Sequence, residues 1–235
     1  MKEFGGHIGR KYARIDLEGR KVLREGRGRI NEFPLAEALE GWKHTFSITA
    51  EFDSAANQEI QRRILDILAN MENELGVSLL LASRDFPLHA TIQNGIFEGE
   101  DGAKEKKIFQ ELAGDEGIIQ SEKEITGIFV IFKYLLIDKG NILLTASEIP
   151  EAIIEARNRA SHEYMAKGLR PLPMEHILHL TLARIVGKPP QGAEKAFNDY
   201  QQRLVQLRHA ISASPISARI EKVKKGRASD TFSPQ

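Results

Sequence analysis

The chain has 235 residues, 41% hydrophobic and 28% charged, a composition typical of a globular protein large enough to bury a sizeable core. It has no cysteine, which excludes disulfides, thiolate catalysis and cysteine-ligated metal centres. No apolar run is long enough to span a bilayer, and the opening residues lack the apolar core of a secretory signal. We therefore expect a cytoplasmic protein with no membrane segment.

The formal net charge of zero hides an uneven distribution of charge. Residues 1–32 carry nine lysines and arginines against five acids, and a second basic cluster lies at residues 219–227. Either segment could attract a polyanion such as RNA by releasing counterions. A solvated surface strand and a charged tail explain the two segments equally well.

Residues 1–41 are predicted to form a basic N-terminal arm or hairpin, ahead of a main domain at 42–225. Alternation over 12–17 and a turn signal at 18–20 favour the hairpin. The apolar content of this segment is too low for it to fold alone. Residues 226–235 are predicted to be a disordered tail.

The first half of the main domain is predicted to run strand, helix, strand, helix. The expected elements are a strand at 46–52, a helix at 54–75, a short strand at 77–81, a strand at 88–93 and a helix at 103–113. In the first strand large apolar residues alternate with Thr45, Ser47 and Thr49, a small polar face that suits a wet cleft better than a core. Asp101 is positioned to cap the last of these helices.

The second half is predicted to repeat this order after a β-hairpin. The expected elements are strands at 125–137 and 141–147, a helix at 149–167, a strand at 177–186, a helix carrying Phe197 to Ile211 and a closing strand at 216–223. The turn Asp138-Lys139-Gly140-Asn141 is the strongest hairpin signal in the chain. Pro150 suits the first turn of its helix and Gly168 suits the end.

The pattern His-x-Thr-apolar occurs twice in the chain, ninety residues apart. Each copy lies in a predicted strand, where residues i and i+2 point to the same side, so His89 shares a face with Thr91 and His179 shares one with Thr181. If the strands are neighbours, two imidazoles that transfer protons near neutral pH meet two hydroxyls that can hold an anion. The simpler interpretation is two unrelated strands, each with an inward histidine and a β-favouring threonine.

The repetition of elements around these motifs predicts the architecture. Two similar halves with their helices outside would enclose a groove between two sheets, with both motifs on its floor. We therefore expect an α+β fold with two pseudo-symmetric lobes, whose antiparallel sheets line a central groove.

This arrangement resembles the two-histidine phosphoesterase superfamily, and within it the LigT-like proteins often called 2′-5′ RNA ligases. The likeness is carried by His89-Ala90-Thr91-Ile92 and His179-Leu180-Thr181-Leu182, the second continuing as Ala183-Arg184 as in bacterial and archaeal members. It covers residues 42–224 in element order. After Thr91 the chain runs Ile92-Gln93-Asn94-Gly95, where many relatives have a more apolar strand with a lysine or phenylalanine. This departure leaves the substrate subclass open.

The resemblance implies a metal-independent phosphodiesterase without a cofactor, acting on RNA 3′ ends or cyclic nucleotides. His89 and His179 would be the catalytic pair, and Thr91 and Thr181 would hold the phosphate. Arg184 is a weaker candidate for substrate binding, because in an ideal strand it points away from the groove. A bulge or strand end near Ala183 would be needed to turn it inward. We expect a monomer without an obligatory protein partner.

Other interpretations of the same residues remain open. The groove could belong to a non-catalytic module that binds RNA or nucleotides, an alternative supported by the basic segments alone. Glu175, His176 and His179 could be imagined as a metal cluster, although the β-rich run that follows argues against the helix such spacing needs. In the hairpin, Lys133 or Tyr134 could reach the groove or simply cover the core.

Overall fold

The computed structural model describes residues 12–19, 43–75, 78–138, 141–174, 177–185 and 194–231. The helices are α3 (Ser54–Ile60), α4 (Asp66–Leu75), α5 (Gly102–Ala113), α6 (Glu116–Ile125), α7 (Glu151–Ala166), α8 (Glu194–Ala213) and α9 (Ala228–Thr231), with a π-helical turn (Gln61–Leu65) between α3 and α4. The strands are β1 (Thr45–Phe52), β2 (Leu79–Leu81), β3 (Ala90–Ile96), β4 (Phe129–Asp138), β5 (Asn141–Ala146), β6 (Arg170–Pro171), β7 (His179–Ile185) and β8 (Ile216–Arg227).

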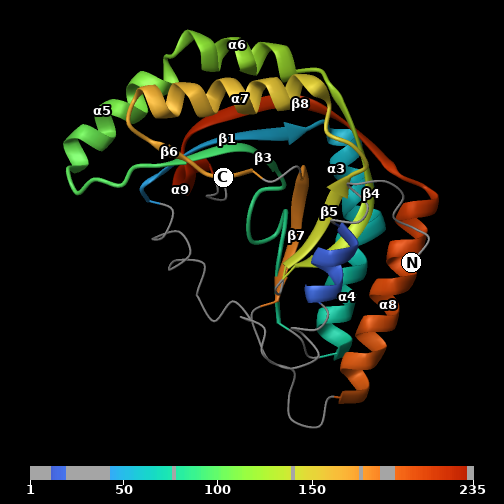
Figure 1. Cartoon of the computed structure of the whole chain (residues 1–235). Coiled ribbons are helices and arrows are strands. Elements are labelled where there is room, and N and C mark those ends of the chain that lie inside the picture. Colours follow the sequence, from blue (N-terminus) through green and yellow to red (C-terminus); the bar gives the residue numbers. More distant parts are fainter. Residues whose placement is uncertain are drawn as a thin grey trace.

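The strands form one antiparallel sheet in the order β2-β7-β5-β4-β8-β1-β3-β6. This sheet consists of two four-stranded halves, β2-β7-β5-β4 and β8-β1-β3-β6, which are joined where β4 pairs with β8. The halves also touch where β3 pairs with β7. The predicted α+β fold with two lobes and outer helices is confirmed (Figure 1), but the two predicted sheets are halves of a single curved one.

The two lobes are related by a pseudo-two-fold repeat, in which elements from the first half of the chain correspond to elements from the second. The run β1, α3–α4, β2, β3 in the first half of the chain corresponds to β5, α7, β6, β7 in the second. Each short strand pairs with the motif strand of the other half, β2 with β7 and β6 with β3. The halves therefore depend on each other for sheet edges, and both motif strands lie where the lobes meet.

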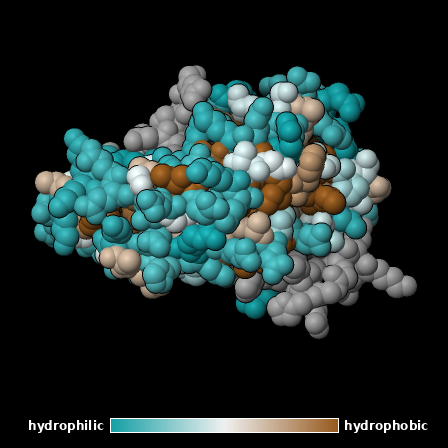
Figure 2. Space-filling view, turned by 90° about the horizontal axis from the view of Figure 1, so that it is seen from above, coloured by the Kyte–Doolittle hydropathy of each residue, from teal (hydrophilic) through white to brown (hydrophobic). Residues whose placement is uncertain are grey.

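Helices cover the two halves of the sheet separately. The α5, α6 and α7 helices lie over the lobe that contains β1, β3 and β8, and α3, α4 and α8 lie beside the other lobe (Figure 1). The ring of Phe46 in β1 packs edge-on against Phe109 of α5 and Tyr164 of α7. From the side of α6 and α7 the surface is mostly hydrophilic, with small apolar groups between (Figure 2).

Local signals in the sequence account for most of the element boundaries. The Asp53 side chain accepts a hydrogen bond from the backbone N–H of Ala56 and caps α3, and Asp101 caps α5 in the same way. Gly168, beyond α7, has a φ of 84°, a left-handed conformation that favours glycine. The predicted hairpin is present, since β4 and β5 pair up to Asp138 and Asn141.

The hairpin predicted in the N-terminal segment is wrong for the residues described, because residues 12–19 form a helix. The helix buries Tyr12 and Asp16, one turn apart, while Arg14 pairs with Glu18 across the next turn. The Asp16 carboxylate accepts a hydrogen bond from the backbone N–H of Ile137 and pairs with the buried guanidinium of Arg208 in α8. Tertiary contacts on one helical face thus override the alternation of the sequence.

Three other expectations also need correction. The strand expected from residue 125 begins at Phe129, because α6, capped by Asp115, occupies the preceding residues and was not predicted. Residues 226–231 are not a disordered tail, since β8 continues to Arg227 and α9 follows. The polar face of β1 is not a wet cleft, because its three hydroxyl side chains are almost fully buried. The α9 helix packs against β1 and β8.

Within the described ranges, no helix combines the length and apolar character needed to cross a membrane.

Candidate active site

The pairing of β3 with β7 brings the two motifs together. Among the described residues, one bridge joins these strands, from Ala90 to Leu180. In an antiparallel pair the residues flanking a bridge also face each other, so His89 lies across from Thr181 and Thr91 lies across from His179. Ala90 and Leu180 are fully buried on one side of the sheet, and the four motif side chains are partly exposed on the other. The register therefore gathers all four groups at the junction of the lobes.

Both motif strands have a β-bulge directly after the motif threonine. In β3 the partners of β1 skip Ile92, and in β7 the partners of β5 skip Leu182. A bulge inserts one residue and resets the alternation of side chains. As a result Asn94 and Arg184, each three residues after its threonine, return to the face that carries the motif. The sequence pattern gives no sign of the bulge in β3.

The bulge in β7 supplies the turn that Arg184 needs to face the site. Thr181 and Arg184 pair with Leu143 and Asn141, which are two residues apart on β5 and therefore on one face. The Arg184 guanidinium lies 5.8 Å from the ring centre of Phe86, and its charge acts on His89. The structure thus brings Arg184 to the motif quartet, on the side of His89.

His89 has a defined tautomer. Its Nδ1 lies 2.8 Å from the carbonyl oxygen of Pro87, which can only accept, so Nδ1 carries the hydrogen of the neutral ring. Burial lowers the pKa of His89 to about 4, and the charges of Arg184 and Lys224 act in the same direction. The Pro87 carbonyl and the Glu51 carboxylate oppose this shift by favouring the protonated ring.

Among the described residues, the charged or titratable groups that act on His179 are Arg157 and the other motif histidine. Burial lowers the pKa of His179 to about 4, and the positive charge of Arg157 and the neighbouring His89 lower it further. Across the sheet its partner in β5 is the buried Thr145. Both motif histidines are therefore neutral at pH 7, and an anion bound between them would raise the pKa of each ring.

Glu51 and Lys224 are site residues that the motif analysis missed. Glu51 follows Ala50, the partner of Ala90, so the register sets it across from His89. Lys224 of β8 lies on the same face, and its Nζ is 2.5 Å from the Glu51 carboxylate. Only the strand register reveals this pair, because Glu51 belongs to no motif and Lys224 was seen as part of a basic cluster.

That basic cluster is largely neutralised by acids. Besides the Lys224 pair, Lys225 forms an ion pair with Glu122, and Arg227 lies 3.4 Å from the carboxylate of Glu105. The cluster lies in the strand β8 and not in a free tail. Most of the other basic segment, residues 1–32, lies outside the described residues.

A pocket of about 400 Å³ adjoins His89. It is lined by Glu51, Phe52, Asn57, Ser83, Pro87, Leu88, Glu221 and Lys222. Ser83 has a φ of 64°, an unusual value for a residue other than glycine. The lining combines apolar and hydrogen-bonding groups, and it includes none of the four motif residues.

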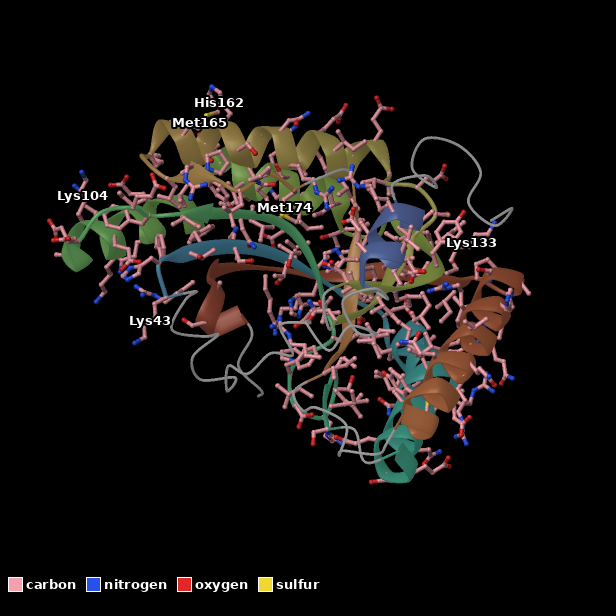
Figure 3. All side chains as sticks on the ribbon, turned by 60° about the horizontal axis from the view of Figure 1, so that its bottom comes forward. Lys43, Lys104, Lys133, His162, Met165 and Met174 are labelled. Carbon is pink, nitrogen blue, oxygen red and sulfur yellow. The ribbon has the colours of Figure 1, made fainter. Side chains whose placement is uncertain are left out.

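The other candidate residues do not join the motif quartet or lie outside the described residues. Tyr134 pairs with Thr145, the partner of His179, so it lies on the motif face, where it is buried against Tyr12 in a small apolar cluster separate from the main core. His162 points outward from α7 (Figure 3). Of the imagined metal cluster, Glu175 and His176 lie outside the described residues, and the described residues contain no group of three or more potential His, Cys, Asp or Glu ligands.

Several solved structures are similar to this chain. The phosphodiesterase domain of MHV ns2 has 12% identity and a TM-score of 0.43, covering 79% of this chain and 99% of that one. Usb1 of Kluyveromyces marxianus has 14% identity and a TM-score of 0.41, covering 80% and 95%. E. coli LigT has 17% identity and a TM-score of 0.39, covering 60% and 71%.

Comparison by sequence finds no counterpart, since no protein-family model and no curated protein matches the chain. The identities and TM-scores of the similar structures are low. The function therefore has to be argued from the residues of the site.

Proposed function

We propose that the chain is a metal-independent phosphodiesterase of the two-histidine type, which opens 2′,3′-cyclic phosphates or hydrolyses related phosphodiester bonds of RNA and nucleotides. The observation that carries this proposal is the register of β3 and β7, with each motif histidine across from the threonine of the other motif. Two proton-transfer groups and two hydroxyls around one space match the needs of phosphoryl transfer to water. Arg184 would add a positive charge for the phosphate on the side of His89.

The reaction needs one proton removed and one supplied. A base takes a proton from water as the water oxygen attacks phosphorus, and an acid gives a proton to the ribose oxygen as the phosphorus–oxygen bond breaks, leaving a phosphate monoester and a free hydroxyl. The hydroxyls of Thr91 and Thr181 would donate hydrogen bonds to the remaining phosphate oxygens. Every step uses groups that the chain itself provides.

The surroundings of the two rings suggest which histidine has which role. His89 has the Glu51 carboxylate and the Pro87 carbonyl to stabilise its protonated form, so we assign it as the acid. His179 has cationic Arg157 and the other imidazole as neighbours, which keep it neutral and suit it to act as the base. Binding of the anionic substrate would raise the pKa of His89, so that the ring takes up a proton before it acts as the acid.

The test is turnover of 2′,3′-cyclic nucleotides, 2′-5′-linked dinucleotides and ADP-ribose cyclic phosphate in the presence of EDTA. We expect hydrolysis of at least one of these substrates, and loss of roughly 10²–10⁴-fold in His89→Ala and in His179→Ala. His162→Ala, a change on the outer side of α7, is the matched control and should keep full activity. Retention of RNA without turnover by the unaltered chain would favour the non-catalytic alternative, and inhibition by EDTA would point to a metal enzyme.

A nucleoside p-nitrophenyl phosphodiester distinguishes the two roles. Its leaving group departs without a proton, so the variant that lacks the acid should recover much of its activity on this substrate. We expect recovery in His89→Ala and not in His179→Ala. Recovery in His179→Ala alone would reverse the assignment.

A further inference from the structure

Arg157 of α7 connects the two motif strands through hydrogen bonds to their backbone. Its side chain is only 7% exposed. Its Nε donates a hydrogen bond of 2.9 Å to the carbonyl oxygen of Ile92, and its Nη2 donates one of 2.9 Å to that of Ile177. Ile92 directly follows Thr91, and Ile177 precedes His179 by two residues. One guanidinium therefore holds the backbone of both motifs.

Both carbonyl groups lie outside the regular pairing of the sheet. Ile92 is the bulged residue that has no partner in β1, and Ile177 precedes the first residue of β7. A buried backbone carbonyl needs a hydrogen-bond donor. Arg157 is the donor at both positions, so the carbonyl that the bulge in β3 leaves unpaired is satisfied by this arginine.

This connection matters because the sheet itself joins the two strands weakly. Within the described residues, β3 and β7 share a single bridge. One bridge leaves the strands free to shear or to hinge, whereas the planar guanidinium has two donors at a fixed separation. The distance between the motifs thus depends on the bridge and on Arg157 together.

We propose that Arg157 is a positioning residue, whose two hydrogen bonds set the spacing of the histidine–threonine pairs across the junction of the lobes. This inference rests on the proposed function, since it assigns a role within that same site. Arg157 acts through the backbone of Ile92 and Ile177, to which it donates its hydrogen bonds, in addition to the effect of its charge on His179.

The first test compares kinetic constants of Arg157→Lys and Arg157→Met with those of Arg159→Lys and Arg159→Met. Arg159 lies on the same helix but donates its hydrogen bonds to Ser121 and Glu124 of α6, so it controls for changes to α7. A lysine keeps the charge but replaces two nitrogen donors with one. We expect kcat to fall about a hundredfold in both Arg157 variants, as displacements near 1 Å do, with KM changed by only a few-fold.

Arg157→Lys decides this test even if Arg157→Met does not fold. Full kcat in a folded Arg157→Lys protein would overturn the proposal, because charge alone would then suffice. Wild-type kinetics in the Arg159 variants are the expected control result. An equal loss of kcat in Arg159→Lys would also overturn the proposal, since the effect would belong to the helix and not to the two carbonyls.

A second test needs no enzymatic activity and uses the absence of native cysteines. Extending the register by one residue from the Ala90–Leu180 bridge sets His89→Cys across from Thr181→Cys, and facing residues of antiparallel strands have Cα separations that a disulfide can span. The rate of disulfide formation then reports how well the strands hold their spacing. We expect this rate to change several-fold when Arg157→Lys is added and to stay the same with Arg159→Lys.

The two tests separate this inference from the proposed function. If the unaltered chain hydrolyses none of the substrates, but the rate of disulfide formation in the double-cysteine variant depends on Arg157, the proposed function is wrong and the spacing role stands. A rate that is indifferent to Arg157→Lys would overturn the spacing role, whatever the chain hydrolyses.

Discussion

The two motif strands have the same backbone but different surroundings. In both β3 and β7 a histidine and a threonine share one face, and a bulge follows the threonine. The residue that the bulge returns to this face is Asn94 in β3 and Arg184 in β7. The histidine of the first motif has a carboxylate among the groups that act on it, whereas that of the second has Arg157.

Under the proposed function, this difference would let a repeated element serve an asymmetric reaction. Transfer of a phosphoryl group to water needs similar groups on both sides of phosphorus, which the repeat provides. It also needs one ring to donate a proton while the other accepts one, and the repeat alone cannot provide that. Residues outside the motifs, Glu51, Lys224 and Arg157, distinguish the two rings.

The largest expected effect concerns the two motif threonines, which the repeat places at equivalent positions of β3 and β7. Thr91→Val and Thr181→Val keep the shape of each side chain and remove the hydroxyl. We expect each to lower kcat/KM by about 10²–10³-fold, the usual effect of losing one donor to a transition-state oxygen. Steady-state kinetics on the best cyclic substrate would measure it.

Comparison of the two variants makes the threonine test informative. Similar losses would mean that both hydroxyls contact the phosphate, as the register suggests. Full activity in either variant would remove that threonine from the site. Thr126→Val is the matched control, since this hydroxyl bonds to the backbone at the end of α6.

Stability at low pH tests the two histidines as a pair. Both have a pKa lowered from 6.5 to about 4, so between these values the unfolded chain binds more protons than the folded one. The contribution of these two rings to the free energy of unfolding should therefore be fully present above pH 6.5. It should be lost as the pH drops towards 4, by at most about 3 kcal/mol for each ring. Urea unfolding at pH 7 and pH 4.5 measures this fall.

Substitution by glutamine assigns the fall to individual rings. His89→Gln and His179→Gln should each reduce the loss of stability between the two pH values, because glutamine does not titrate. The same measurements on Thr126→Val, which removes no titratable group, give the control. If neither motif variant alters the loss, folding does not lower the pKa of either ring.

The sequence predicts those features of the fold that depend on local patterns. The Asp101 cap, the Asp138–Asn141 hairpin and the glycine after α7 all follow from short-range chemistry. The helix at residues 12–19 could not be predicted in this way. It depends on a carboxylate meeting Arg208 and the backbone of Ile137, both far away in the sequence.

The residues of the candidate site also fall into two groups, those that local patterns in the sequence predict and those that they do not. Its four motif residues are visible in the sequence, because each pair follows the two-residue period of a strand. Arg184 was predicted only on condition of a bulge, which β7 has. Glu51, Lys224 and Arg157 could not be found, because strand order and helix packing bring them to the motifs and no pattern in the chain records either.

The smallest expected effect concerns the residues that the two bulges return to the site. Arg184→Gln removes a charge on the phosphate side of His89, and we expect KM to rise about tenfold, with a smaller change in kcat. Asn94→Ala, at the corresponding position of β3, removes no charge, so we expect a change of threefold or less. Kinetics in 50 and 200 mM salt should show a weaker salt dependence of KM in Arg184→Gln, because one cation fewer contacts the anionic substrate. Equal effects of the two substitutions would mean that the positions after the two bulges contribute equally to substrate binding. The asymmetry of the site would then lie entirely in the groups around its histidines.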